Sequence, residues 1–372
     1  MPRLRAFRWQ AWAEWTEREV FADRPNAIAI DTETSGLGFH DLAFCATLSW
    51  RGRDGSLKSG YVDLEAEDLP AVSSGAMRAA LLHRILSGVP RWVFWNSKFD
   101  LQKLDYLGAL PPLDGYIIED GQPIAALLNE NRRMALKVRA VEDLGHVGTV
   151  EVEVKSGPRK GQMKKVAKEE HQLAAVRRKL KLKKEDGYHL LPREALIPYA
   201  LKDTELTLRW WEKFRPLLPP DLEPVYAEEI EVMRVLLEME SNGIGIDVPY
   251  LTEAGDEWGA KVMTGWQELV DLTGREDFNP NSPIQLTAAF EAAGVSLEST
   301  DKAAMRDLLA NEKSPPQARA LAEALHEYRS AEKVYGTYLR PLLAEQRDGI
   351  AHPWFNSVGP RTGRTSSSTA AN

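Results

Sequence analysis

Cysteine is nearly absent from this 372-residue chain, in which Cys45 is the single residue of its type. One cysteine excludes an intramolecular disulfide and a metal site built from several cysteines, and it fits a reducing, cytoplasmic setting. No run approaches the roughly 18 apolar residues of a membrane-spanning helix, so we expect no membrane partner. Positive charge is not in excess, because 47 lysines and arginines against 55 acids give a net charge of −8. A uniformly basic nucleic-acid coat is therefore excluded, whereas a local basic groove is not.

The first half of the chain has the pattern of an α/β domain. Short apolar runs bounded by turn residues predict strands, and the turn Arg51-Gly52-Arg53-Asp54-Gly55 predicts that the second and third strands form a hairpin. The expected strands are residues 27–31, 42–50, 60–64 and 91–95, with a helix near 75–86 and a tryptophan-rich amphipathic helix within 1–22. This order predicts a mixed sheet flanked by helices.

The second half has a mainly helical pattern. The clustered prolines of residues 215–221 predict a linker, because proline ends helices. Beyond it, helices are expected over residues 225–242 and 318–343, and Ser282 before Pro283 is typical of a helix start. We therefore divide the chain into a helical extension (1–26), an α/β domain (27–215) and a helical region (222–372).

One segment is strongly basic. Residues 155–184 hold twelve lysines and arginines, among them Lys164, Lys165, Arg177 and Arg178, against the two acids Glu169 and Glu170. Val166, Leu173, Val176 and Leu180 recur at helical spacing, so the second half of the segment predicts a basic amphipathic helix. Either the segment is a solvated insertion or it contacts nucleic-acid phosphates.

Two carboxylates close the first predicted strand. Residues two apart in a strand point to the same face, so Asp31 and Glu33 are expected to project together from one end of the sheet. Two neighbouring acids repel each other unless a cation lies between them. Hard oxygen ligands favour Mg²⁺ or Mn²⁺, and the pair therefore predicts a divalent metal.

Three further residues fit this pair. Asp100 follows the strand at 91–95 and starts a helix, and Tyr199 and Asp203 stand four apart, which places both on one helix face. Four carboxylates and a tyrosine are what two-metal cleavage of a phosphodiester requires. Taken singly, Asp100 could be a helix cap, and Tyr199 with Asp203 an ordinary exposed pair.

With these motifs the chain resembles the DEDD-type 3′–5′ exonucleases of the subclass with tyrosine in the third motif. The resemblance implies a ribonuclease H-like fold and two Mg²⁺ or Mn²⁺ ions. It implies that Asp31, Glu33 and Asp203 hold the first ion, that Asp31 is shared with the second, and that Asp100 supports that ion through water. Tyr199 would position the attacking water. Leu37 matches a wedge leucine that packs on the terminal bases, and Asn96 matches a residue near the primer 3′ end.

The second half resembles the opening of the polymerase region of family A DNA polymerases. The matching segments are residues 228–247, 278–286, Glu327-Tyr328-Arg329 with Lys333 and Thr337-Tyr338, and His352, Phe355-Asn356 and 362–368. In that family the last segment approaches the primer–template duplex, a role implied here for Arg364, Ser366 and Ser367. The resemblance implies an exonuclease domain over 27–215, with a basic insertion at about 150–190, followed by a thumb.

The family continues into palm and fingers, whereas this chain stops at Asn372. We therefore expect a 3′–5′ DNA exonuclease with a thumb, unable to polymerise alone, from the cytoplasm of a bacterial or phage-infected cell. It could be a fragment, a truncated product or half of a split polymerase. The alternative is a non-catalytic DNA-binding scaffold that completes a separate palm–fingers chain, and an RNA-trimming exonuclease is disfavoured by the thumb.

Overall fold

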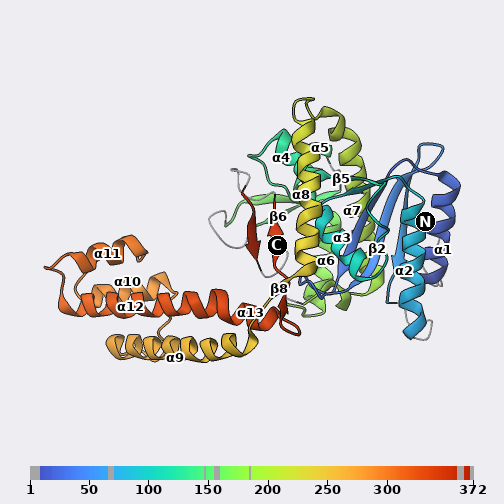
Figure 1. Ribbon diagram of the computed structural model, residues 1–372. Helices are drawn as coiled ribbons and strands as arrows, with labels where there is room; N and C mark the ends of the chain where they lie inside the picture. Colours follow the sequence, from blue (N-terminus) through green and yellow to red (C-terminus); the bar gives the residue numbers. More distant parts are fainter. Residues whose placement is uncertain are drawn as a thin grey trace. The chain divides into compact units, whose positions relative to one another are not determined.

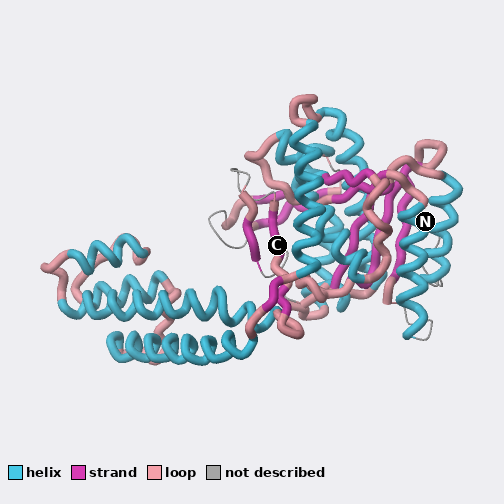
Figure 2. Tube along the Cα trace, viewed as in Figure 1, coloured by secondary structure: helices cyan, strands magenta, loops and turns pink. Residues whose placement is uncertain are grey.

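The computed structural model describes residues 9–65, 71–145, 148–154, 160–183, 186–357 and 364–368. The chain forms two compact units, one of Met1–Asn242 with Pro353–Asn372 and one of Gly243–His352. The first unit contains a five-stranded sheet with helices around it, and the second is almost entirely helical (Figures 1 and 2). This is the predicted fold class, a mixed sheet flanked by helices followed by a mainly helical region.

The elements of the first unit come mostly before Asn242. In chain order they are α1 (Trp9–Asp23), β1 (Ile28–Thr34), β2 (Ala43–Arg51), β3 (Leu57–Asp63), α2 (Ala71–Ser87), β4 (Arg91–Phe94), α3 (Ser97–Tyr106), β5 (Ile117–Asp120), α4 (Gly121–Leu128), α5 (Leu136–Leu144), β6 (Thr149–Glu153), β7 (Met163–Ala167), α6 (Lys168–Lys179), η1 (Tyr188–Leu190), α7 (Arg193–Phe214), η2 (Arg215–Leu217), α8 (Glu223–Asn242), β10 (Trp354–Asn356) and β11 (Ser366–Ser368).

The main sheet has the strand order β3-β2-β1-β4-β5. β1, β2 and β3 pair antiparallel, which confirms the predicted hairpin, and β4 and β5 join in parallel to β1. β5 was not predicted, because only two of its four residues, Ile117 and Ile118, are apolar. Each face of the sheet is covered by helices. Ile28 and Ile30 pack into one core with α1, α2 and α3, while Ala29 packs against Leu208 of α7 on the opposite face.

The predicted N-terminal helix packs directly on the sheet. Ala13 and Val20 of α1 are buried, and a Cβ atom placed on Gly60 of β3 would lie 2.3 Å from the Thr16 side chain. Gly60 therefore allows α1 to approach β3 closely. Residues 1–8 lie outside the described part of the chain, so the start of the predicted helix within 1–22 is not addressed.

The basic segment forms a hairpin and a helix. β6 and β7 pair antiparallel, and α6 follows directly, which confirms a helix in the second half of the segment. Val166 belongs to β7 and Leu180 is 44% exposed after the helix ends, so the predicted apolar stripe is shorter than expected. Leu173 is buried in a cluster with Leu196 and Ile197 of α7, which anchors the insertion to that helix.

The second unit contains β8 (Ile244–Gly245), α9 (Val248–Thr273), α10 (Pro283–Ala292), α11 (Lys302–Ala310), α12 (Pro316–Val334), the π-helix η3 (Tyr335–Leu339), α13 (Arg340–Glu345) and β9 (Ile350–Ala351). Ser282 caps α10 as predicted, by accepting a hydrogen bond from the Gln285 amide. The single helix predicted over 318–343 is interrupted by η3. Pro341 has no N–H for the Thr337 carbonyl, which accounts for the break in the α-helical hydrogen bonds.

The compact units divide at Gly243, beyond the proline-rich segment that we chose as the linker. α8 follows that segment, yet Tyr226, Ile230 and Met233 of α8 are buried in the core of the first unit. The chain also returns to the first unit at Pro353. The predicted boundaries, which follow the family resemblance, stay a prediction.

Candidate metal and nuclease site

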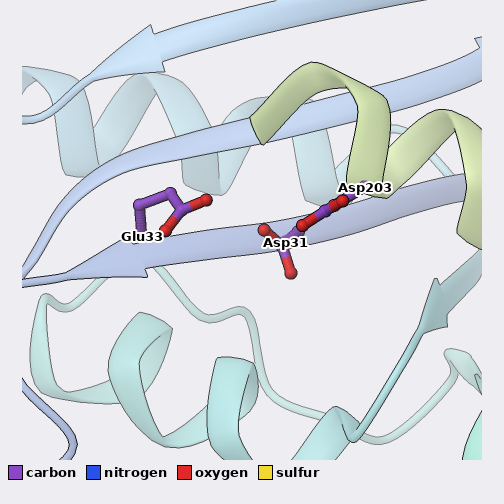
Figure 3. Close-up of side chains that lie close together, drawn as sticks. All are labelled: Asp31, Glu33 and Asp203. Carbon is purple, nitrogen blue, oxygen red and sulfur yellow. The ribbon is translucent and has the colours of Figure 1, made fainter. Parts of the chain in front are cut away.

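Three acids converge on the C-terminal half of β1, which continues to Thr34, beyond the predicted end of the strand. Asp31 and Glu33 lie two apart on this strand, and Asp203 reaches them from α7 (Figure 3). One ligand oxygen of each lies within 4.8 Å of the others, a spacing at which one cation can contact all three. Asp31 is partly exposed, while Glu33 and Asp203 are buried. The i, i+2 spacing read from the sequence therefore brings the pair together as predicted.

Hydrogen bonds to β2 fix the register of α7. The Thr47 hydroxyl donates to the Ala200 carbonyl at 3.1 Å, and the Ser49 and Thr204 hydroxyls lie 2.8 Å apart. Ala200 and Thr204 flank Asp203 in sequence. Because Thr47 is the antiparallel partner of Asp31, these contacts hold Asp203 opposite that residue. The polar residues of β2 on this face therefore place the third acid.

Asp100 approaches the same strand end from α3. Its Oδ1 accepts from the Thr32 backbone N–H at 2.8 Å and from the Thr32 hydroxyl at 2.7 Å. Thr32 lies between the two strand acids, so Asp100 is bound beside them. Both bonds use Oδ1, which leaves Oδ2 able to accept from a water. Burial raises the pKa of Asp100, and the negative charge of Asp31 raises it further.

A fifth acid, which we did not predict, orients α3. Asp120 at the end of β5 accepts from the backbone N–H of Asn96 at 3.0 Å and of Ser97 at 2.6 Å, and from the Ser97 hydroxyl at 2.6 Å. It also accepts from the Gln122 N–H as the N-cap of α4. Asp120 therefore supplies the cap that Asn96, in a left-handed conformation with φ 78°, does not give α3. Asp100 is consequently not the helix cap.

Tyr199 lies one turn before Asp203 on α7. Its ring meets that of Tyr188 edge-to-face, with the two centroids 5.8 Å apart. Burial raises the pKa of Tyr199 well above its ordinary value, and the nearby Glu33 charge raises it further. The phenol therefore stays protonated at neutral pH and can donate or accept a hydrogen bond without serving as a base.

The acids resist ionisation when they are close together and out of water. Burial raises the pKa of Asp31 to about 7, and burial together with the Asp31 charge raises that of Glu33. Lys137 of α5 acts in the opposite direction on both. Its ammonium pairs with the Asp203 carboxylate and lies 4.3 Å from the centroid of the Tyr199 ring. Burial lowers the pKa of Lys137 to about 8.

The predicted DNA-contacting residues lie in several places. Leu37 is 54% exposed. Asn96 lines a small cavity with Asp120 and Trp354. The exposed residues Arg364, Ser366 and Ser367 lie on or beside β11, whereas Thr362 and Gly363 fall outside the described residues.

Among the four basic residues that were predicted to contact DNA from the insertion, three are exposed and the fourth contacts other residues of the protein. Lys164, Lys165 and Arg178 are exposed. Arg177 donates to the Asp186 carbonyl at 2.8 Å and lies over the Tyr188 ring at 5.5 Å from its centroid. Its contacts are therefore within the insertion, toward the tyrosine that packs against Tyr199.

Three site residues were missed from the sequence: Asp120, Lys137 and Tyr188. None shares a local motif with Asp31 or Asp203, since each lies on a different element and meets the site only through the fold. The apolar pair Ile117 and Ile118, shortly before Asp120, is the one local signal that points to any of them.

A five-stranded sheet with these acids at its central strand, in a chain that also has a separate helical unit, is an architecture with solved counterparts. The chain aligns over 98% of its length with the polymerase domain of Pol1 from M. smegmatis, solved with a DNA primer–template and dNTP. The TM-score is 0.58, the identity is 19%, and 54% of that chain is covered. At this identity the likeness shows the fold. No membrane-crossing helix was found among the described residues.

Sequence comparisons give the relationship. The chain is 26% identical over 346 residues to DNA polymerase I of Borreliella burgdorferi, a match covering 91% of this chain and 34% of the relative. It is 35% identical over 148 residues to DNA polymerase I of Helicobacter pylori, a match that covers 38% of this chain and 16% of that relative. It is 32% identical over 192 residues to DNA polymerase DpoZ of Vibrio phage phiVC8, a match that covers 47% of this chain and 30% of that relative.

No family model matches the chain. The similarity to DNA polymerase I nevertheless extends over most of its length, and the chain is related to the family A DNA polymerases. The matched part spans only 16% to 34% of the length of these three relatives.

Proposed function

We propose that this chain is the 3′–5′ exonuclease portion, with the thumb, of a family A DNA-directed DNA polymerase that acts in DNA replication or repair. Its substrate would be the 3′ end of DNA, either single-stranded or frayed from a primer–template duplex. The observation that carries the proposal is the convergence of Asp31, Glu33 and Asp203 within 4.8 Å, with Tyr199 one helical turn away.

The donor set fits a hard divalent cation. All three side chains offer carboxylate oxygens, the ligand type that Mg²⁺ and Mn²⁺ prefer. The pKa values of Asp31 and Glu33 are raised even though Lys137 opposes the rise, because burial favours the protonated acids and the Asp31 charge acts further on Glu33, so a divalent cation would relieve the crowding. Asp31, Glu33 and Asp203 would hold one ion, and Asp31 and Asp100 would serve a second. Two such ions would activate a water and stabilise the leaving 3′ oxygen.

The protein residues would position the reactants. Tyr199 stays protonated, so its hydroxyl is suited to orienting the attacking water by hydrogen bonding rather than to removing its proton. Thr32 restrains Asp100 through two hydrogen bonds to one oxygen, which directs the other oxygen away from the strand. The exposed Leu37 could pack against the terminal base. These roles follow the family resemblance and the contacts described above.

The test uses the purified chain with Mg²⁺ and a 5′-labelled single-stranded DNA. We expect stepwise shortening from the 3′ end, with none after chelation of the metal. Asp31→Ala should abolish the activity, since it removes the carboxylate proposed to serve both ions. Asp105→Asn is the matched control, because this acid is exposed on α3 and lies outside the cluster.

A second candidate is a non-catalytic DNA-binding scaffold. The exposed basic residues Lys164, Lys165 and Arg178 favour it, because they provide charge for phosphate contacts without requiring the acids. If the chain binds DNA and shortens neither DNA nor RNA with either metal, the scaffold replaces the exonuclease. Shortening of RNA alone would instead identify an RNA-trimming enzyme.

A further inference from the structure

Lys137 is a buried cation inside the acidic cluster. It lies near the start of α5, with a side chain only 16% exposed, and its ammonium pairs with Asp203. The same ammonium lies over the ring of Tyr199. One lysine therefore contacts both of the α7 residues assigned to the site.

The charge of Lys137 extends across the cluster. It is attracted by Asp31 and Glu33, and its charge opposes the rise in the pKa of each. In the metal-free protein the lysine thus does part of what a metal would do, since it offsets the repulsion among carboxylates held within 4.8 Å of one another. A divalent cation that used Asp203 would have to displace it.

The basic insertion offers an alternative location for this charge. Glu169 and Glu170, the two acids among its twelve basic residues, lie in the first turn of α6 and also attract Lys137. They would let the ammonium turn from Asp203 toward α6 while it remains partly paired.

We propose that Lys137 is a built-in counter-ion that holds the acid cluster together without metal and is exchanged from Asp203 toward Glu169 and Glu170 when a divalent cation binds. It acts as a positioning residue, because it works through the carboxylates and through Tyr199. The inference rests on the proposed function, since it takes these acids to be metal ligands.

The first measurement is Mn²⁺ binding to the full chain by titration calorimetry, which does not depend on activity. Lys137→Met keeps the length of the side chain and removes its charge, and therefore removes the competitor. We expect the dissociation constant for Mn²⁺ to fall about tenfold or more. With a chelator present, Lys137→Met should unfold at a lower temperature than the wild type. Addition of Mn²⁺ should raise the unfolding temperature of the variant by more than it raises that of the wild type.

Lys103→Met is the matched control. Lys103 is also buried, but its ammonium donates to the Gly38 and Phe39 carbonyls instead of the acids. The Lys103→Met variant should be less stable than the wild type, with no change in its affinity for Mn²⁺. Lys137→Arg, which keeps the positive charge, should bind Mn²⁺ within about twofold of the wild type.

Glu169→Gln with Glu170→Gln tests the exchange and changes only residues outside the metal cluster. This double variant should bind Mn²⁺ about threefold more weakly, because Lys137 loses its alternative partners. In the Lys137→Met background the same two changes should have little effect, so the two sets of substitutions are coupled. A purely structural lysine would give additive effects.

The possible results separate the two proposals. Measurable Mn²⁺ binding that is equal or weaker in Lys137→Met overturns the counter-ion and leaves the metal site intact. If the wild type binds no Mn²⁺, and Asp31→Ala is indistinguishable from it, the metal site and the counter-ion both fail. If Lys137→Met does not fold, the Glu169→Gln and Glu170→Gln changes are tested in a Lys137→Gln background instead. Additive effects of these substitutions on Mn²⁺ affinity would overturn the proposal.

Discussion

Tyr199 is held by a second tyrosine, and this single contact is open to test. Tyr188 of η1, near the end of the basic insertion, packs edge-to-face on its ring. The ring of Tyr188 is covered in turn by Arg177. The orientation of the proposed water-positioning phenol therefore depends on a residue outside the acidic motifs.

We predict that Tyr188→Ala lowers the rate of 3′-end cleavage about three- to tenfold, since an aromatic pair contributes about 0.5–1.5 kcal/mol. The effect should appear in single-turnover rates and not in DNA affinity. Tyr199→Ala should cost more, and adding Tyr188→Ala to it should change little, because the ring contact would already be absent. An equal loss of cleavage rate from the Tyr188 substitution in the wild type and in the Tyr199 variant would show that Tyr188 acts independently of Tyr199.

Lys103 gives a prediction about pH. Burial lowers its pKa from 10.5 to about 8, while Asp41 opposes this shift. Because the unfolded chain binds more protons between these values, the contribution of Lys103 to stability is fully present above about pH 10.5 and is lost as the pH falls from there to about 8. The free energy of unfolding of the wild type, relative to Lys103→Met, should therefore increase by roughly 2 kcal/mol from about pH 8 to about pH 10.

Urea unfolding at the two pH values measures this difference. Lys302→Met, at an exposed lysine on α11, is the control and should show no such pH dependence. A constant difference between the wild type and Lys103→Met would mean that Lys103 is charged equally in both states.

At the scale of elements, the insertion combines an anchored side with an exposed one. Leu173 packs against α7, while Lys164 and Lys165 on β7 and Arg178 on α6 are exposed. In the β6–β7 hairpin Lys165 faces Glu151 and Lys164 faces Val152, so only part of the β7 charge has a cross-strand partner of opposite sign. Phosphate contacts from these residues would depend strongly on salt.

We predict that neutralising Lys164, Lys165 and Arg178 to glutamine weakens binding of single-stranded DNA and reduces the slope of log K against log salt by about 2. The control removes three exposed arginines, Arg18, Arg24 and Arg53, from α1 and the nearby turns. An unchanged slope in the insertion variant would leave this segment as a solvated surface. Arg177 is kept in both variants because its loss would also disturb Tyr188.

The sequence predicted those elements whose side chains repeat along the chain. β1, β2 and α8 were found because their apolar residues recur at the spacing of a strand or a helix, and the hairpin because its turn is rich in glycine. Asp31, Glu33 and Asp203 followed from local spacing. Lys137 and Asp120 could not, because their roles arise where α5 and β5 meet other elements in space, and no local pattern records such contacts.

At the scale of the whole molecule, the two units have separate cores. Trp50, Trp92 and Trp210 are fully buried in the first unit, while Leu269, Phe290 and Leu325 lie in the core of the second. The acidic cluster belongs only to the first unit. A ligand that binds the folded state stabilises the unit that holds its site.

We therefore predict two thermal unfolding transitions by calorimetry, and we expect Mn²⁺ to raise the midpoint temperature of only one of them. Leu325→Ala should lower the other transition, since removing a fully buried leucine costs about 2–5 kcal/mol. In this variant the shift produced by Mn²⁺ should be unchanged. A single transition that responds both to Mn²⁺ and to Leu325→Ala would show instead that the two cores unfold as one cooperative structure.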